Sequence, residues 1–547
     1  MGESLMIWYD QRVKKEWKLA FASAFLIGLV VHMMRFTNVL PNHDSLFNFY
    51  SNQNMLGSGR WFLTIACSLS GFYDLPWMIG LLSLLYMAIT SVIVVDMFKI
   101  RNPILILLTG GMLISFPAVT DTVNYQFTAD GFMMAMMLAA AGASMTQMEL
   151  ESAPKKMVRY AAAGVLLCLS CGIYQAYISF ALVLAICGFM LELLEGRRTL
   201  AECMKWIGKQ ALLYGGALAS YYLIWKICMK VQGYVPTQYL GIDQVGTINV
   251  QMIKAGLHDS IVSLLRFLFP GVFANRSMDL YTALNVVFVV LAVCGVGVCI
   301  FRCGLMKRRG QFGLLLVCFV ALPICAYIWY FVTRMLTYSP RMLQSLCILY
   351  IFVGVVYERW LRPRASDWMA LVLALTILNN GLISNVFYNY LNLIYERSYA
   401  SAVEMNVQIQ ALDDGTVQTI AIVGHTNGVK DQDWINLSKA SLGCLTTDDG
   451  TLMSDQVHAA LFLSTYTDFS LSYYLENDLE YPRITEGADS FVGKGYEFRF
   501  PLADAELCEE LEQSDKVVQM PVWPAAGSVR RIGDTIVIKL ADIEETD

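Results

Sequence analysis

The stretch LAFASAFLIGLVVHMM, from Leu19 to Met34, is soon followed by PNHDSLFNFY, from Pro41 to Tyr50. The first stretch is apolar enough to enter a bilayer, and the second places His43 and Asp44 where the chain leaves it. A carboxylate beside a bilayer is costly unless it is hydrated, paired or bound to an ion. Asp44 is therefore either a solvated loop acid or a residue of a functional site.

The segment after Asp44 brings further polar and aromatic side chains to the same level. Ser45 to Met55 has the pattern of a short amphipathic segment, which we expect to lie on the membrane surface. The turn GSGRW, residues 57–61, then adds a cation, Arg60, and an interfacial aromatic ring, Trp61. This surrounding pattern favours a functional site in the loop.

Composition places the chain among multi-pass membrane proteins. It has 547 residues, of which 56% are hydrophobic and 15% charged, and its mean hydropathy is +0.50. These values are too apolar for a soluble enzyme. We predict an α-helical membrane protein with about eleven spans, some of them tilted or sheltered. The apolar runs are 19–34, 77–98, 103–116, 131–148, 157–173, 176–194, 211–229, 281–300, 312–332, 342–357 and 368–386.

The charge of the chain changes sign near Tyr395. Up to Ile394 there are 29 Lys and Arg residues against 18 Asp and Glu, whereas from Tyr395 onward there are 10 against 27. We therefore predict a transmembrane domain at 1–394 and an acidic, extracytoplasmic α/β domain at 395–547. Within the latter, 419–423 and 535–540 have the pattern of strands, and 505–513 that of a helix.

Basic side chains fall in every second loop between the apolar runs, at 99–101, 155–159, 197–209, 302–309 and 359–364. By the positive-inside rule these loops and the N-terminus are cytoplasmic, and an odd number of spans then places the C-terminal domain outside. The candidate loops share that outer face, where no nucleotide pool exists. The chain has no GxxxxGK[ST] phosphate loop, which argues further against an ATP-driven pump.

Two further segments on that face carry candidate binding residues. FPAVTDTVNYQFTAD, from Phe116 to Asp130, contains the loop that we expect at 117–130. It places Asp121 and Asp130 at the outer ends of two successive spans, with Tyr125 and Phe127 between them. Carboxylates accept hydrogen bonds from sugar hydroxyls and aromatic rings stack on pyranose faces, but a helix cap by Asp130 beside an aromatic belt explains the stretch as well. Tyr174 and Gln175 form the second segment, for which a plain helix-to-helix turn is the alternative.

Five arginines lie on the face where the topological bias disfavours positive charge: Arg60, Arg266, Arg276, Arg334 and Arg341. For Arg266 and Arg276 we prefer contact with lipid headgroups. Arg341 follows Pro340 at the head of a span, and a guanidinium fixed at that height suits a phosphate group. We predict that Arg60 and Arg341 meet a fixed anion.

Several short motifs, in this order, resemble the bacterial Gtr (GtrII-like) glucosyltransferase family of the polytopic GT-C group. They are Asp44 after the first span, GRW at 59–61, FTAD at 127–130, YQ at 174–175, SPR at 339–341 and VWPAAGSVRRIGDTIVIKL at 522–540. The resemblance implies a GT-C-like membrane fold and a transferase that uses a polyprenyl-phosphate-linked glucose on the outer face. Because no second acid is adjacent to Asp44, a two-carboxylate metal motif is incomplete, and a divalent cation, Mg²⁺ or Mn²⁺, is left open.

The mechanism that fits both the residues and the resemblance is one displacement at the anomeric carbon, with inversion. Asp44 would be the general base, oriented by His43, and Arg60 and Arg341 would stabilise the departing phosphate. The expected pocket for sugar and acceptor contains His43, Asp121, Tyr125, Asp130, Tyr174 and Gln175. The expected partners are the lipid-linked sugar donor, membrane lipids and an acceptor that is a surface glycan, a teichoic acid or other wall polymer, or a lipid; no nucleic acid is expected.

Two other classes of protein compete with a transferase. A lipid-linked glycan transporter or flippase needs a site near the midplane that is reachable from both sides, whereas the candidates here gather at one face. The other class is a non-catalytic scaffold or sensor whose C-terminal domain binds a partner.

Overall fold

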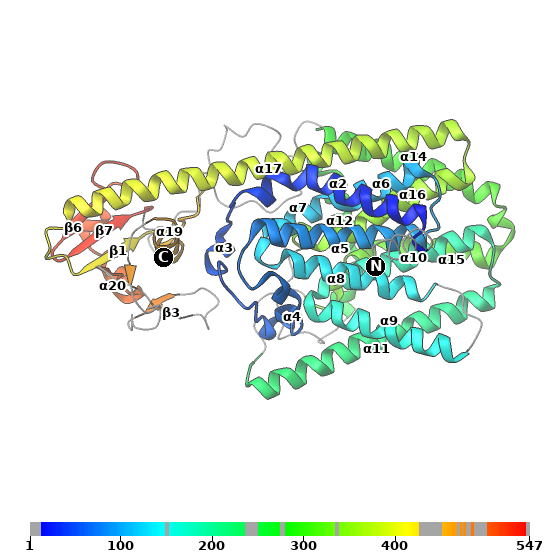
Figure 1. Ribbon diagram of the computed structural model, residues 1–547, viewed down its shortest axis with the longest axis horizontal. Coiled ribbons are helices and arrows are strands. Elements are labelled where there is room, and N and C mark those ends of the chain that lie inside the picture. Colours follow the sequence, from blue (N-terminus) through cyan, green and yellow to red (C-terminus); the bar gives the residue numbers. More distant parts are fainter. Residues whose placement is uncertain are drawn as a thin grey trace, which may run out of the picture. The chain divides into compact units, whose positions relative to one another are not determined.

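Figure 1 shows the computed structural model of the chain, which describes residues 12–147, 153–235, 250–273, 279–333, 338–425, 451–467, 471–472, 474–476, 483–485 and 500–542. These residues divide into two compact units. The helical unit contains the described residues up to Val39 and from Tyr50 to Phe387. The C-terminal unit contains Leu40–Phe49 and the described residues from Tyr388 onward. The loop with Asp44 therefore belongs to the C-terminal unit, although it follows the first long helix.

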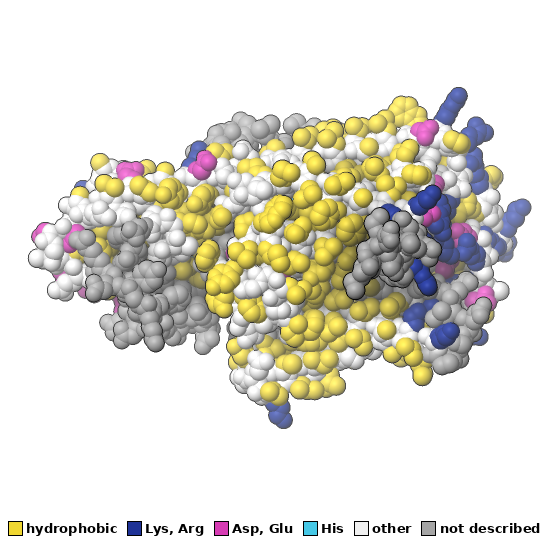
Figure 2. All heavy atoms as spheres, viewed as in Figure 1, with side chains coloured by type: hydrophobic (Ala, Val, Ile, Leu, Met, Phe, Trp, Pro, Cys, Tyr) yellow, Lys and Arg dark blue, Asp and Glu magenta, His cyan; other side chains and the backbone are white. Residues whose placement is uncertain are grey.

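Eleven helical segments of the described residues are long and apolar enough to cross a membrane, as predicted. Figure 2 shows a broad hydrophobic surface over several of them. The polytopic helical membrane fold is thereby confirmed. The segments are α2 (Lys15–Thr37), α5 (Pro76–Met97), α6 (Pro103–Ser115) with α7 (Pro117–Asn124), α8 (Gln126–Met145), α9 (Ala153–Ile173), η3 (Gln175–Tyr177) with α10 (Ile178–Glu195), α11 (Leu200–Gln232), α14 (Leu280–Arg302), α15 (Arg309–Ala326), η7 (Pro340–Leu346) with α16 (Cys347–Trp360), and α17 (Pro363–Leu412).

The break between α6 and α7 differs from the sequence prediction, which expected a loop from Pro117 to Asp130. Phe116 is extended, as the residue before a proline prefers, and Pro117 then starts a new helix. At the other end of α7, Arg35 of α2 donates to the carbonyl oxygens of Val123 (2.9 Å) and Asn124 (3.2 Å). Because protein groups satisfy these carbonyls, the segment stays helical and every residue of α7 is buried.

The basic loops of the helical unit contact one another. Arg359 pairs with Glu195 at 2.8 Å and donates to the carbonyl of Phe98. Arg302 donates to the carbonyl of Trp360 at 2.7 Å. Figure 2 shows Lys and Arg side chains gathered at one end of this unit.

The C-terminal unit contains a small three-stranded sheet of order β1–β7–β6. β1 (Thr419–Val423) is parallel to β7 (Thr535–Lys539), and β6 (Val529–Ile532) is antiparallel to it. The sheet packs with α20 (Ala505–Glu512) and α21 (Asp515–Val518) around buried Val423, Cys508, Val517 and Val537. The strands and the helix predicted here from the sequence are present.

Candidate active site

Arg341, at the start of η7, is bound by α7. Its backbone N–H donates to Asp121 Oδ2 at 3.0 Å, and its Nη1 atom lies 3.9 Å from the same oxygen. Its guanidinium carbon lies 3.7 Å from the centre of the Tyr125 ring, a close cation–π contact. Asp121 is fully buried and the Arg341 side chain is 19% exposed. The structure therefore brings three of the predicted residues together.

The local sequence explains why Asp121 is needed beside Arg341. Pro340 begins η7, and the first N–H groups of a helix have no acceptor within it. Asp121 supplies an acceptor for the N–H of Arg341, while the guanidinium Nη1 is buried without a hydrogen-bond partner among the described residues. A phosphate oxygen placed there would gain a charge-assisted hydrogen bond without displacing another acceptor.

Arg60 provides a second cation beside a pair of stacked rings. Its guanidinium carbon lies 5.0 Å from the ring centre of Tyr174 and 5.7 Å from that of Phe132. The two rings are stacked, with their centres 4.3 Å apart. Tyr174 therefore lies within cation–π range of Arg60.

The turn that carries Arg60 is held by η3 and α11. Gln175 Nε2 donates to the carbonyl of Ser58 at 2.7 Å and to the hydroxyl of Tyr221 at 2.9 Å, and that hydroxyl donates to the carbonyl of Gly59 at 3.1 Å. Gly59 has a φ of 83°, and a Cβ atom there would collide with Tyr221 and Gln175. Only glycine fits this position, so the turn places Arg60 at a defined height.

A cavity of about 300 Å³ opens beside these residues. Arg60, Tyr174 and Gln175 line it, as does Met342, the residue after Arg341. Most of the remaining wall is apolar or aromatic and comes from Leu218, Tyr221, Tyr222, Trp225, Trp329 and Val332. Such a cavity suits a largely apolar ligand with an anionic group near the arginines.

Asp130 lies outside this cavity. It is fully buried, its Oδ1 accepts from the N–H of Gly131 at 2.8 Å, and its carboxylate interacts with the side chains of Ser70 and Cys67. These contacts join α8 to α4 (Leu63–Cys67) and η2 (Ser68–Ser70). Asp130 does not cap α8 either, since Tyr125 holds the N-cap position. Its predicted part in sugar binding stays a prediction.

His43 and Asp44 begin the five-residue helix α3 (His43–Phe47) of the C-terminal unit. Asp44 is exposed, and its carbonyl accepts from Asn48 Nδ2 at 2.7 Å. The amphipathic segment predicted from Ser45 to Met55 is not a continuous helix. α3 ends at Phe47, and Gln53 has a φ of 54°, which no α-helix accommodates.

Sequence analysis missed Arg35, whose bonds fix the end of α7. The first predicted apolar run ends at Met34, one residue before Arg35. An ionisable residue at the edge of a span is itself an indication of a functional or structural role. Arg35 also interacts with Asp74: burial raises the pKa of the Asp74 carboxyl, and the charge of Arg35 opposes that rise. Tyr221 and Trp225 were missed as well, although their spacing of four places them on one face of a helix.

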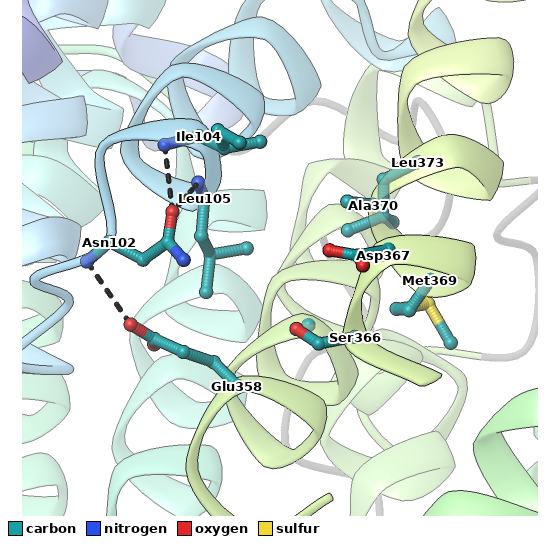
Figure 3. Close-up of a pocket in the computed structure, with 10 residues that line it drawn as sticks. Asn102, Ile104, Leu105, Glu358, Ser366, Asp367, Met369, Ala370 and Leu373 are labelled. Carbon is teal, nitrogen blue, oxygen red and sulfur yellow. Dashed lines mark hydrogen bonds between the residues drawn. The ribbon is translucent and has the colours of Figure 1, made fainter. Parts of the chain in front are cut away.

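Further cavities lie in the helical unit, of which two border segments discussed above. One of about 390 Å³ lies between α9 and α11 and is lined by small and apolar side chains and by Trp61, the neighbour of Arg60. The other, shown in Figure 3, is about 30 Å³, at the start of α6, where Asn102 caps the helix and its N–H donates to Glu358 at 3.1 Å. The 13-residue helix α6 rises about 20 Å from there toward α7. The small cavity is therefore not part of the candidate site.

The described residues contain no group of three or more His, Cys, Asp or Glu side chains arranged to hold a metal ion. The chemistry that their arrangement supports is binding of an anion by two arginines and contact with a ring or hydrocarbon by the aromatic side chains.

Comparison with known protein families gives a match. A family model described as "Glucosyl transferase GtrII" matches residues 33–358. The match contains Asp44, Arg60, Asp121, Tyr174 and Arg341. Neither the curated proteins nor the solved structures contain a match.

Proposed function

The chain belongs to the glucosyl transferase GtrII family, and from this premise we propose that it moves glucose from a polyprenyl-phosphate donor to an acceptor outside the cytoplasm. Membership makes it a membrane glucosyltransferase with a sugar donor and an acceptor as substrates. The proposal adds the lipid phosphate carrier, the side of the membrane and the roles of individual residues.

The observation that carries the donor proposal is the pair of arginines beside an apolar cavity. Arg60 lines the cavity, and Arg341 precedes another lining residue, Met342. A polyprenyl phosphate combines an anionic group with a long hydrocarbon chain, so it matches two cations next to aromatic and aliphatic walls. A nucleotide-linked sugar would bring a polar base and ribose into the same apolar space.

The arginines would act on the leaving group. When the bond from the anomeric carbon to the phosphate breaks, negative charge grows on the phosphate oxygens. Preplaced cations stabilise that charge more in the transition state than in the ground state. Asp121 holds the backbone of Arg341 and Tyr125 supports its guanidinium, so these two residues would position the cation and not carry a proton.

Asp44 is the proposed general base for the acceptor hydroxyl. A base must be reachable by its substrate, and of the three predicted acids Asp121 and Asp130 are fully buried whereas Asp44 is exposed. Transfer by one displacement would invert the anomeric centre. Tyr174 and Gln175 would contact the glucose, and His43 would support Asp44. The acceptor would be a surface glycan, a teichoic acid or other wall polymer, or a lipid.

The transfer assay tests this proposal. Membranes with the wild-type chain should transfer labelled glucose from polyprenyl-phosphate glucose, and Arg341→Ala should lower the rate roughly ten- to a hundredfold. This range follows from the loss of a charge-assisted hydrogen bond of about 1.5–3 kcal/mol. Arg341→Lys should fall between them, because it keeps the charge but loses the planar contact with Tyr125.

Arg302→Ala is a matched control, since Arg302 binds a carbonyl at the basic end of the helical unit. Full activity of Arg341→Ala would remove this residue from the donor site. Transfer from nucleotide-linked glucose but not from the polyprenyl donor would overturn the donor proposal. Movement of the intact lipid-linked sugar across sealed vesicles without transfer would support the transporter alternative instead.

The proposed orientation has a cytoplasmic N-terminus and an extracytoplasmic C-terminal domain. It rests on the basic loops, which contact one another at one end of the helical unit. In intact cells, a membrane-impermeant thiol reagent should label Ala526→Cys and not Arg364→Cys. The reverse pattern would invert the orientation.

A further inference from the structure

The short helix that carries Asp44 packs against α19 (Gln456–Tyr466) of the same unit. The imidazole of His458 meets the ring of His43 edge-on, with centres 4.9 Å apart, and that of Phe47 edge-on at 5.3 Å. His43 and Phe47 are the first and last residues of α3. One side chain of α19 thus touches both ends of the helix that presents Asp44.

α3 has little stability of its own. It has five residues, and isolated helices shorter than about 12 residues are marginal even with favourable sequences. Asn42 caps it, since its side chain accepts from the N–H and the hydroxyl of Ser45 at 2.8 and 2.9 Å. A cap fixes where the helix begins but supplies no packing surface. That surface includes the side chain of His458.

His458 is itself held in one orientation. Its Nδ1 atom lies 2.6 Å from Asp455 Oδ2, and its backbone N–H donates to Asp455 Oδ1 at 2.9 Å. Asp455 is also the N-cap of α19, and the hydroxyl of Ser454 donates to it at 3.1 Å. Both oxygens of this carboxylate are therefore engaged, so the ring of His458 is fixed relative to α19.

α19 is anchored to the rest of the C-terminal unit. Tyr395 on α17 contacts the rings of Phe462 and Tyr466, with centres 6.2 and 5.4 Å apart. Gln456 Nε2 donates to the carbonyl of Ala503 at 2.7 Å, which ties α19 to the segment between β5 (Phe500–Pro501) and α20. A continuous series of contacts therefore links the rest of the C-terminal unit, through α19 and His458, to α3.

We propose that the C-terminal unit is a positioning element of the enzyme, and that His458, oriented by Asp455, holds α3 of this unit so that Asp44 faces its substrate. The proposal deepens the proposed function, because it rests on Asp44 as the base. His458 is a positioning residue, since it contacts the helix that bears the base and not the reacting atoms. The contact joins two segments more than 400 residues apart in the sequence.

The test compares His458→Ala with His458→Phe in the full-length protein. His458→Ala removes the packing against α3, so kcat should fall about ten- to a hundredfold, because a small displacement of a reacting group lowers the rate by this order. The KM for polyprenyl-phosphate glucose should stay within about twofold, because the donor arginines are untouched. His458→Phe keeps an aromatic edge and should restore most of kcat. Hydrogen exchange of residues 40–50 should be faster in the alanine variant only.

His425→Ala is the matched control, since His425 lies 3.9 Å from the same carboxylate and is 60% exposed. It should change neither kcat nor exchange at 40–50. If His458→Ala does not fold, Phe47→Ala removes the contact with His458 from the α3 side and leaves α19 unchanged. Unchanged exchange at 40–50 in both variants, or an unchanged kcat, would overturn the positioning role.

The outcomes separate this proposal from the assignment of the base. If hydrogen exchange at 40–50 rises in His458→Ala but Asp44→Asn transfers glucose normally, Asp44 is not the base. The positioning role is then wrong as well, although the packing of His458 on α3 is confirmed. If Asp44→Asn is inactive but His458→Ala keeps full kcat, the base stands and the positioning role is wrong.

Discussion

Asp121 and Asp44 are both acids beside a predicted membrane face, but they differ in burial and in the unit to which they belong. Asp121 sits in α7, is fully buried, and is bonded to the backbone of Arg341. Asp44 sits in a five-residue helix of the other unit and is exposed. The buried acid contacts a cation, whereas the exposed acid is accessible. Burial, more than residue type, therefore separates the acid that we propose as a support of Arg341 from the acid that we propose as the base.

The largest effect is expected from removing the buried acid. Asp121→Ala leaves the buried Arg341 guanidinium without its carboxylate, which typically costs about 3–5 kcal/mol. Thermal unfolding in detergent should occur at a clearly lower temperature, and transfer should fall with it. Asp121→Asn should be milder, because the amide oxygen still accepts from the N–H of Arg341. If the stability of both variants matches the wild type, Asp121 is not the support of Arg341.

Asp44→Asn should act on the chemistry alone. The amide keeps the size of the carboxylate but cannot take a proton, so transfer should fall by about a hundredfold or more at unchanged folded yield. Exposed substitutions without such a role usually change stability by less than about 0.5 kcal/mol. The measurement is glucose transfer by purified proteins at matched folded concentration. Transfer near the wild-type rate would return Asp44 to the status of a solvated loop acid.

A smaller effect is expected at Asp455, a third acid of intermediate burial. Burial opposes its ionisation, but hydrogen bonds to His458 and Ser454 lower the pKa of its carboxyl to about 2. Because this pKa lies below the ordinary value of 3.8, the stabilisation is full above about pH 4 and is lost as the pH falls toward 2. Asp455→Asn should remove about 2 kcal/mol at neutral pH and flatten the acid dependence.

Pepsin cleavage within the C-terminal unit between pH 2 and 4.5 measures this dependence. Asp414→Asn is the control, because Asp414 pairs with Arg531 on an exposed surface, where ion pairs contribute little. A wild-type cleavage rate that follows the same pH curve as Asp455→Asn would contradict the role of this carboxylate.

The helical membrane fold could be predicted because its signal is carried by composition over long windows. In a bilayer, apolar runs such as 77–98 and 281–300 satisfy their backbone polar groups as helices, so the number of spans followed from the sequence. The short strands near Val423 and Thr535 followed from their own local patterns. Arg60 and Arg341 could be selected as candidates for a similar reason. A positive charge such as Arg341 at the head of a span is unusual enough to stand out, and the order of short motifs indicated the family.

The partners of these residues were decided by tertiary structure. We expected a loop at 117–124, but Arg35, which lies more than 80 residues earlier, satisfies the carbonyls at the end of α7, and the segment is a helix. Asp121 and Asp130 read alike in the sequence, yet one binds Arg341 and the other joins α8 to η2. The packing of His458 on α3 left no mark in the sequence near either segment. Burial and pairing depend on residues that are remote along the chain, and local patterns contain no information about them.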